Sequence, residues 1–225
     1  MVEIMKKIII AGPWLGEFGW ELMGWQNYLR AISKNHSIVC IGPKSSSYLY
    51  KDFCNEYIDF DISDLGNNNY GFKDGYNRQN VSVDLLKSFV VKTLEEKKYN
   101  IENVVWFPPI KFVHTQGSTF HHFNEKCTFL GNFYFPVYKK FGSDDKKLSN
   151  SFIFHARGRK DVRPDNNWDI SRWEKLKDLL ASSNSQAKFY SIGTKKDSFL
   201  IEVTEDWRGK DLESVCKLMN SSNAV

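Results

Sequence analysis

A single carboxylate stands between two glycines early in the chain, in "GPWLGEFGWELMGWQNYLR" (residues 12 to 30). Gly16 and Gly19 flank Glu17, directly after an apolar run. A carboxylate at the end of a buried strand can accept a proton from a substrate hydroxyl, and the glycines leave room for a bulky substrate. This pattern predicts a general base at Glu17; the alternative is that Glu17 caps the next helix through its dipole. Glu21 is the more natural acid for a first helical turn, which favours the catalytic interpretation.

The glycine spacing differs from the motifs that bind phosphate. It reads G-x-x-x-G-x-x-G, whereas dinucleotide-binding turns read G-x-G-x-x-G, and no Gly-Lys-Ser/Thr is present. A carboxylate about 4 Å from a phosphate charge would cost on the order of 1 to 4 kcal/mol in wet surroundings. An NAD-dependent oxidoreductase is therefore disfavoured.

A basic loop, "HARGRKDVRP" (residues 155 to 164), follows a second apolar strand. It carries Arg157, Arg159 and Lys160, and arginine forks match phosphate oxygens bidentately. Such a loop can hold a diphosphate leaving group, on which negative charge grows as its bond breaks. The alternative is a solvated charged turn. His155 either lies in the core or orients the loop, and Thr194, in "SIGTKKD", is expected near a nucleoside.

These residues predict two halves, one with an acid at its strand end and one with cations. If the halves face each other, a base and an anion clamp share a cleft, which suits transfer of a group from a nucleotide diphosphate to a hydroxyl.

The elements that must position these residues alternate between strands and helices. In the first half, strands are expected over 6–11, 36–43, 57–62 and 103–109. Two amphipathic helices are expected, one with Leu22, Trp25, Leu29 and Ile32 on its apolar face and one with Leu85, Leu86, Phe89, Val90 and Leu94. A short helix is expected over 48–57 and a loop over 64–80. This alternation predicts a parallel sheet with helices on both faces.

Residues 110 to 150 lack this rhythm and are aromatic, then charged and rich in turn formers. We expect a domain boundary there, giving domains 1–145 and 146–225. In the second domain, strands are expected over 151–159 and at "AKFYSIG". A helix is expected to start in a capping box formed by Ser171 and Glu174, with Trp173, Leu176, Leu179 and Leu180 on its core face. A second helix is expected to have Leu212, Val215, Cys216 and Met219 on one side. "NAV" predicts the start of a further strand, so the second domain is expected to be truncated.

Composition excludes several classes. Hydrophobic residues make up 41% and aromatic residues 15%, which is enough for a packed core. The net charge of +4 is weak for a nucleic-acid binder. The four cysteines form no CxxC pair, and His114, His121 and His122 make no convincing metal cluster. Without a signal peptide or membrane-spanning run, a cytoplasmic protein is expected.

The chain resembles glycosyltransferases of the GT-B type, which have two Rossmann-like domains. The closest likeness is to the heptosyltransferase-like family of bacterial surface-polysaccharide synthesis. "LGEFGWE" takes the place of that family's glycine-rich loop with a catalytic acid, usually Asp and here Glu17. "RWEKLKDLL" and "FYSIG" are similar to its second-domain pattern, and "HARGRKD" more weakly resembles the H-x-R loop of GDP-fucose fucosyltransferases.

The resemblance implies sugar transfer from a nucleotide-sugar donor to a glycan or glycolipid acceptor by direct displacement with inversion. Glu17 would deprotonate the acceptor, and Arg157, Arg159 and Lys160 would hold the diphosphate. It implies no metal and no cofactor beyond the donor, and it allows peripheral association with a membrane. Two alternatives stay open: a nucleotide-sugar epimerase on the same fold, and a non-catalytic nucleotide- or carbohydrate-binding module.

Overall fold

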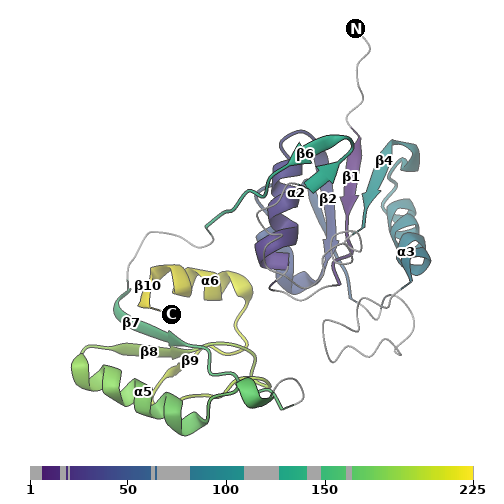
Figure 1. Cartoon of the computed structure of the whole chain (residues 1–225). Helices are drawn as coiled ribbons and strands as arrows, with labels where there is room; N and C mark the ends of the chain where they lie inside the picture. The colour runs from purple at the N-terminus through teal and green to yellow at the C-terminus, as the bar shows by residue number, and fades with distance from the viewer. Residues whose placement is uncertain are drawn as a thin grey trace. The chain divides into compact units, whose positions relative to one another are not determined.

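The chain divides into two compact units, Met1–Lys139 and Lys140–Val225 (Figure 1). The computed structural model describes residues 7–15, 19, 21–61, 64, 82–108, 127–140, 148–160 and 164–224. The boundary expected at residue 145 and most of the loop expected over 64–80 lie outside these residues.

The first unit contains a sheet of four parallel strands. These are β1 (Ile8–Ala11), β2 (Ser37–Gly42), β3 (Glu56–Asp59) and β4 (Val104–Phe107), in the order β3-β2-β1-β4. The expected strands and their parallel pairing are confirmed. β1 and β2 lie in the middle of the sheet, which is why their sequences are apolar throughout rather than alternating.

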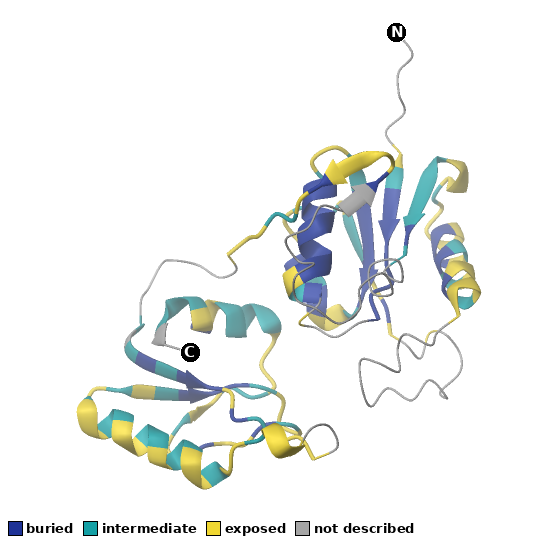
Figure 2. Cartoon of the chain, in the orientation of Figure 1, coloured by how far each residue is buried: buried dark blue, intermediate teal, exposed yellow. Residues whose placement is uncertain are grey.

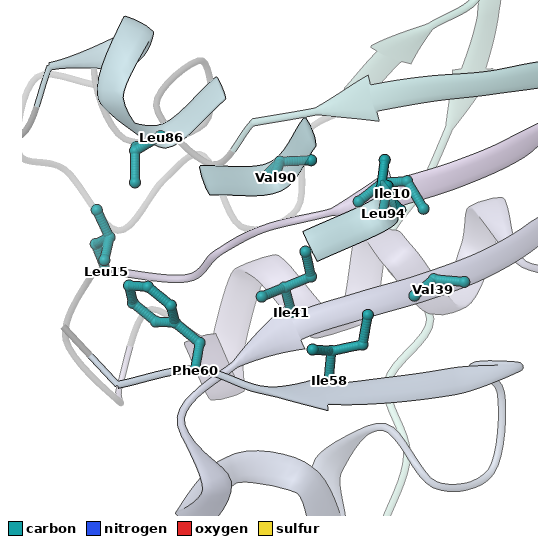
Figure 3. Packing of buried hydrophobic residues seen from close by; sticks show 9 residues of the cluster. All are labelled: Ile10, Leu15, Val39, Ile41, Ile58, Phe60, Leu86, Val90 and Leu94. Carbon is teal, nitrogen blue, oxygen red and sulfur yellow. The ribbon is translucent and has the colours of Figure 1, made fainter. Parts of the chain in front are cut away.

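The helix α3 (Val83–Glu96) covers one face of this sheet. Its residues Leu86, Val90 and Leu94 follow the four-residue spacing of one helical face, and they pack on side chains from the central strands that include Ile10 (Figure 3). The complete cluster is Ile10, Leu15, Val39, Ile41, Ile58, Phe60, Leu86, Val90 and Leu94.

The opposite face is covered as well. Ile9 and Ala11, which alternate with Ile10 along β1, have no exposed surface. A π-helical turn, η1 (Glu21–Trp25), runs directly into α2 (Gln26–Ile32), and α2 and α3 flank the sheet in Figure 1.

The prediction of a short helix over residues 48–57 is wrong. The structure has the 3-10 helix η2 (Lys44–Leu49) instead, followed by a turn. The chain must leave the helix early because Asn55 already joins the sheet: its N–H donates to the Ile38 carbonyl at 2.8 Å, and its side-chain oxygen accepts from the Ile38 N–H at 2.8 Å.

A hairpin that the sequence did not predict lies within the segment without a clean period. Its strands, β5 (Cys127–Phe129) and β6 (Asn132–Tyr134), are antiparallel. They are joined by Leu130 and Gly131, both with positive φ, as a tight two-residue turn requires. The Tyr134 hydroxyl lies 3.2 Å from Nε2 of His36, which ties β6 to the turn between α2 and β2.

The second unit repeats the arrangement of the first. The strands β7 (Leu148–Phe154), β8 (Lys188–Ser191), β9 (Glu205–Asp206) and β10 (Ser222–Ala224) are all parallel, in the order β10-β7-β8-β9. Numbered from the first strand of each unit, both sheets have the order 3-2-1-4, read from opposite edges. The expected strand at "NAV" is confirmed as β10.

The helices of the second unit, α5 (Ile170–Ser183) and α6 (Leu212–Ser221), are confirmed with corrections. The N-cap of α5 is Asp169, not Ser171, because the Asp169 carboxylate accepts from the Ser171 N–H at 2.9 Å and from its hydroxyl at 2.6 Å. Leu179 is 61% exposed, although it was expected in the core.

The buried face of α6 also differs from the expected one. Leu218 is buried and packs with Val215, while Met219 is 38% exposed. In both helices the contact face is rotated slightly from the expected one, so residues at the margin of the apolar stripe turn outward. Figure 2 shows exposed and half-buried residues alternating along α5.

The chain therefore has an α/β fold with two sheets, each built of parallel strands. Within its described segments, no helix combines the length and apolar character needed to cross a membrane.

Candidate functional site

The basic loop begins where β7 ends at Phe154. The register pairs Phe154 with Ser191 of β8, so the loops after both strands leave the same edge of the second sheet. In open parallel sheets this carboxyl edge is where ligands bind.

His155 packs against the glycine that follows β8. Gly193 has a φ of +118°, and a Cβ added there would lie 2.8 Å from Cδ2 of His155 and 2.7 Å from Oγ of Ser198. Only glycine fits this position, which brings the two loops into close contact.

Arg157 is held from two sides. It forms an isolated antiparallel bridge with Ser198, and the next residue, Gly158, donates its N–H to the Asp197 carbonyl at 2.8 Å. On the other side, Nη1 of Arg157 donates to the side-chain oxygen of Asn167 at 3.1 Å. The amide of Asn167 in turn donates to the Arg159 backbone carbonyl at 2.6 Å, so one side chain holds both the Arg157 guanidinium and the main chain at Arg159.

Positive charge gathers at this edge. Arg159 and Lys160 are exposed, and neither forms an ion pair with a carboxylate in the described part of the chain. Arg208 reaches the neighbouring loop after β8, since its Nη1 donates to the carbonyl of Ser198, the residue that pairs with Arg157. With Lys195, whose side chain lies beside Gly209, these residues form what we call the basic cluster: Arg157, Arg159, Lys160, Lys195 and Arg208.

Part of this charge is already compensated. Arg208 donates to Asp206 through Nε at 2.8 Å and through Nη2 at 3.1 Å. This pairing, with a contribution from Lys195, lowers the pKa of Asp206 to about 2. Arg208 therefore mainly orders the turn after β9, and the exposed Arg159 and Lys160 remain the better candidates for anion contact.

The electrostatic environment of His155 reflects the cluster. Partial desolvation of the ring, followed by the charges of Arg159 and Arg157, lowers the pKa of His155. A bound anion would offset both charges and favour the protonated ring.

Thr194 lies in the same loop as Gly193, but its hydroxyl is engaged locally. Its Oγ1 accepts from the Asp197 N–H at 3.0 Å and lies 3.3 Å from the Asp197 carboxylate. The structure thus brings together His155, Arg157, Arg159, Lys160 and Thr194 at one sheet edge, with Thr194 in a turn-forming role.

The site residues expected in the first unit are largely untested. Gly16 and Glu17 lie outside the described residues. Gly19 is exposed, and an added Cβ there would meet no atom within 4 Å.

Sequence reasoning missed the role of Glu21. Its side chain is 1% exposed, and its carboxylate accepts hydrogen bonds from the Ser46 hydroxyl and the Tyr50 hydroxyl, each at 2.7 Å. Burial, and next the negative charge of Glu21, raise the pKa of Tyr50 well above its usual value. The available signal was its spacing: Glu21 precedes Trp25 by four residues, on the stripe that faces the core.

Comparison with protein-family models, curated proteins and solved structures gave no match for this chain. Among the residues that the structure describes, no group of three or more His, Cys, Asp or Glu side chains could hold a metal ion. The candidate site therefore rests on its own geometry.

Proposed function

We propose that the chain is a glycosyltransferase that moves a sugar from a nucleotide-diphosphate donor to a hydroxyl acceptor. The observation that carries this proposal is the basic cluster at the carboxyl edge of a parallel sheet whose strand order, 3-2-1-4, occurs twice in the chain. The order 3-2-1-4 is part of the Rossmann strand order 3-2-1-4-5-6, so its occurrence in two successive sheets supports a GT-B enzyme with two Rossmann-like domains.

The chemistry follows from the charge on the leaving group. When the bond between sugar and diphosphate breaks, negative charge grows on the diphosphate oxygens. Asn167 holds the Arg157 guanidinium and the backbone at Arg159 before any ligand binds, so less conformational entropy is lost when Arg157 clamps that charge.

The acceptor side of the proposal depends on Glu17, which would remove the proton from the attacking hydroxyl, so that the sugar carbon inverts. This assignment rests on the sequence alone. Glu17→Gln is expected to lower turnover by about two orders of magnitude or more, with donor binding little changed.

The test of the donor site is calorimetric titration of the full chain with a panel of nucleoside diphosphates. Arg157→Ala should weaken binding by about 1.5 to 3 kcal/mol, because a charge-assisted hydrogen bond to the ligand is lost. Lys188→Ala is the matched control: it removes the same charge from the first residue of β8, at the opposite edge of the sheet.

Absence of nucleotide binding, or equal weakening by both substitutions, would refute the donor site. Binding without sugar transfer in an acceptor screen would instead favour the non-catalytic binding module.

A further inference from the structure

An exposed tryptophan lies immediately beside the basic cluster. Trp168 follows Asn167, the residue whose side chain contacts Arg157 at 3.1 Å and the Arg159 carbonyl at 2.6 Å. Consecutive Cα atoms are about 3.8 Å apart, so the backbone of Trp168 lies directly beside Asn167, whose side chain contacts the basic loop. Its side chain remains 49% exposed.

The orientation of the Trp168 ring is supported from behind. Its centroid lies 5.1 Å from that of Trp173, at an interplanar angle of 47°. Trp173 in turn packs edge-on against Phe154, the last residue of β7, with centroids 6.1 Å apart. The ring is therefore backed by the core of the second unit, while about half of its surface faces solvent.

Single exposed apolar side chains are common on proteins and need no explanation. Trp168 differs because it combines a backed ring with adjacent cations. A second exposed aromatic side chain of this edge, Phe199, is 36% exposed, but its ring lies against Gly158, where an added Cβ would be only 3.1 Å from it. Trp168 is the more exposed of the two, so it offers the better stacking surface.

We propose that Trp168 stacks on the nucleobase of the nucleotide whose diphosphate contacts Arg157 and Arg159. This inference rests on the proposed donor site and adds a residue to it. A nucleoside diphosphate joins an anionic group to a flat aromatic ring; the cations suit the first part and the indole suits the second. Because every base offers a π-face, this contact stabilises binding without selecting among bases.

The experiment compares three ligands on the full chain by calorimetry: inorganic pyrophosphate, a nucleoside diphosphate and the matching nucleotide sugar. Trp168→Ala should weaken binding of both nucleotides by roughly 5- to 100-fold and leave pyrophosphate unchanged, because pyrophosphate has no base to stack. Trp168→Phe should retain most of the affinity. Leu179→Ala is the control, since it also removes a large exposed apolar side chain, 61% exposed, from the same unit.

The outcomes separate this inference from the proposed function. If neither pyrophosphate nor nucleotides bind, the proposed donor site fails. If all three bind and depend on Arg157 but not on Trp168, the donor site holds and the stacking role is refuted. A loss confined to the nucleotide sugar would also refute base stacking, because Trp168 would then contact the sugar.

Discussion

At the residue scale, Glu21 and the exposed cations Arg159 and Lys160 show how position assigns a role to a charged side chain. The Glu21 carboxylate is almost fully buried, and two hydroxyl donors, Ser46 and Tyr50, compensate it. This arrangement satisfies a buried charge and joins the start of the π-helical turn to η2. Arg159 and Lys160, by contrast, keep their charge accessible to a ligand.

The first prediction concerns Glu21. Glu21→Ala should lower the free energy of unfolding by about 2 kcal/mol, because it leaves the hydroxyls of Ser46 and Tyr50 buried without their acceptor. Urea denaturation measures this change. Glu21→Gln retains one acceptor oxygen and should lose less, so an alanine variant as stable as the glutamine variant would contradict the assigned role.

The second prediction concerns thiol reactivity. A hydrogen bond from Cys40 lowers the pKa of Cys54, whereas burial raises the pKa of Cys40 well above its usual value. A lowered pKa means more thiolate at a given pH, so iodoacetamide should label Cys54 at a lower pH than an ordinary cysteine and should spare Cys40. Peptide mass spectrometry across a pH series measures both.

The matched variants are Cys40→Ala, which removes the donor and should move the labelling profile of Cys54 to higher pH, and Cys40→Ser, which keeps a donor. An identical profile in both would show that the hydrogen bond does not set the pKa of Cys54.

At the element scale, glycine turns set how closely the strand ends approach. Gly12, after β1, has a φ of +118°, and an added Cβ would lie 2.1 Å from the Ile41 carbonyl oxygen of β2. Gly193, after β8, has the same φ and a similarly close neighbour in the second unit. Gly12 lets the chain leave β1 directly beside β2, and Gly193 lets the loop after β8 pack against His155 and Ser198.

Gly12→Ala should therefore lower the free energy of unfolding by about 4 kcal/mol or more, since neither the backbone conformation nor the space accepts a side chain. Gly19→Ala is the control and should change stability by no more than about 1 kcal/mol, because no atom lies within 4 Å of its added Cβ. Circular dichroism during thermal unfolding measures both; a soluble, equally stable Gly12→Ala variant would contradict the assigned geometry.

At the scale of the whole molecule, each unit has its own sheet and its own core. The last residues of the first unit are held by two contacts. The Val137 N–H donates to the Asn27 carbonyl at 3.0 Å, and Nζ of Lys139 lies 2.9 Å from the Asp52 carboxylate. These contacts fasten the segment after the hairpin to the rest of the unit.

We therefore expect residues 1–139 to fold alone, with cooperative urea unfolding and dispersed amide resonances. A shorter fragment, 1–134, lacks Val137 and Lys139 and should be less stable. Equal stability of the two fragments would show that the closing contacts contribute little, and a disordered 1–139 fragment would refute the autonomy of the unit.

Much of the fold was predictable from local patterns. The apolar runs of β1 and β2 and the four-residue spacing of Leu86, Val90 and Leu94 identify buried strands and a helix face within a few residues of sequence. The basic loop could be found in the same way, because Arg157, Arg159 and Lys160 lie within four residues of one another shortly after an apolar strand.

The errors arose where the outcome depends on partners distant in the sequence. Leu179 was expected to be buried because it shares a helix with Leu176 and Leu180, but its exposure depends on how α5 rotates against β7 and β8. The short helix expected over residues 48–57 does not form, because Asn55 pairs with Ile38, 17 residues earlier.

By itself, then, the sequence determined the alternation of strands and helices, the parallel pairing and the position of the cations. Only the tertiary structure decided that Glu21 is buried against Ser46 and Tyr50, and that the Asn167 side chain contacts Arg157 and the Arg159 carbonyl. The physical reason is that periodicity is a property of neighbouring residues, whereas burial and side-chain contact depend on which distant segments the sheet brings together.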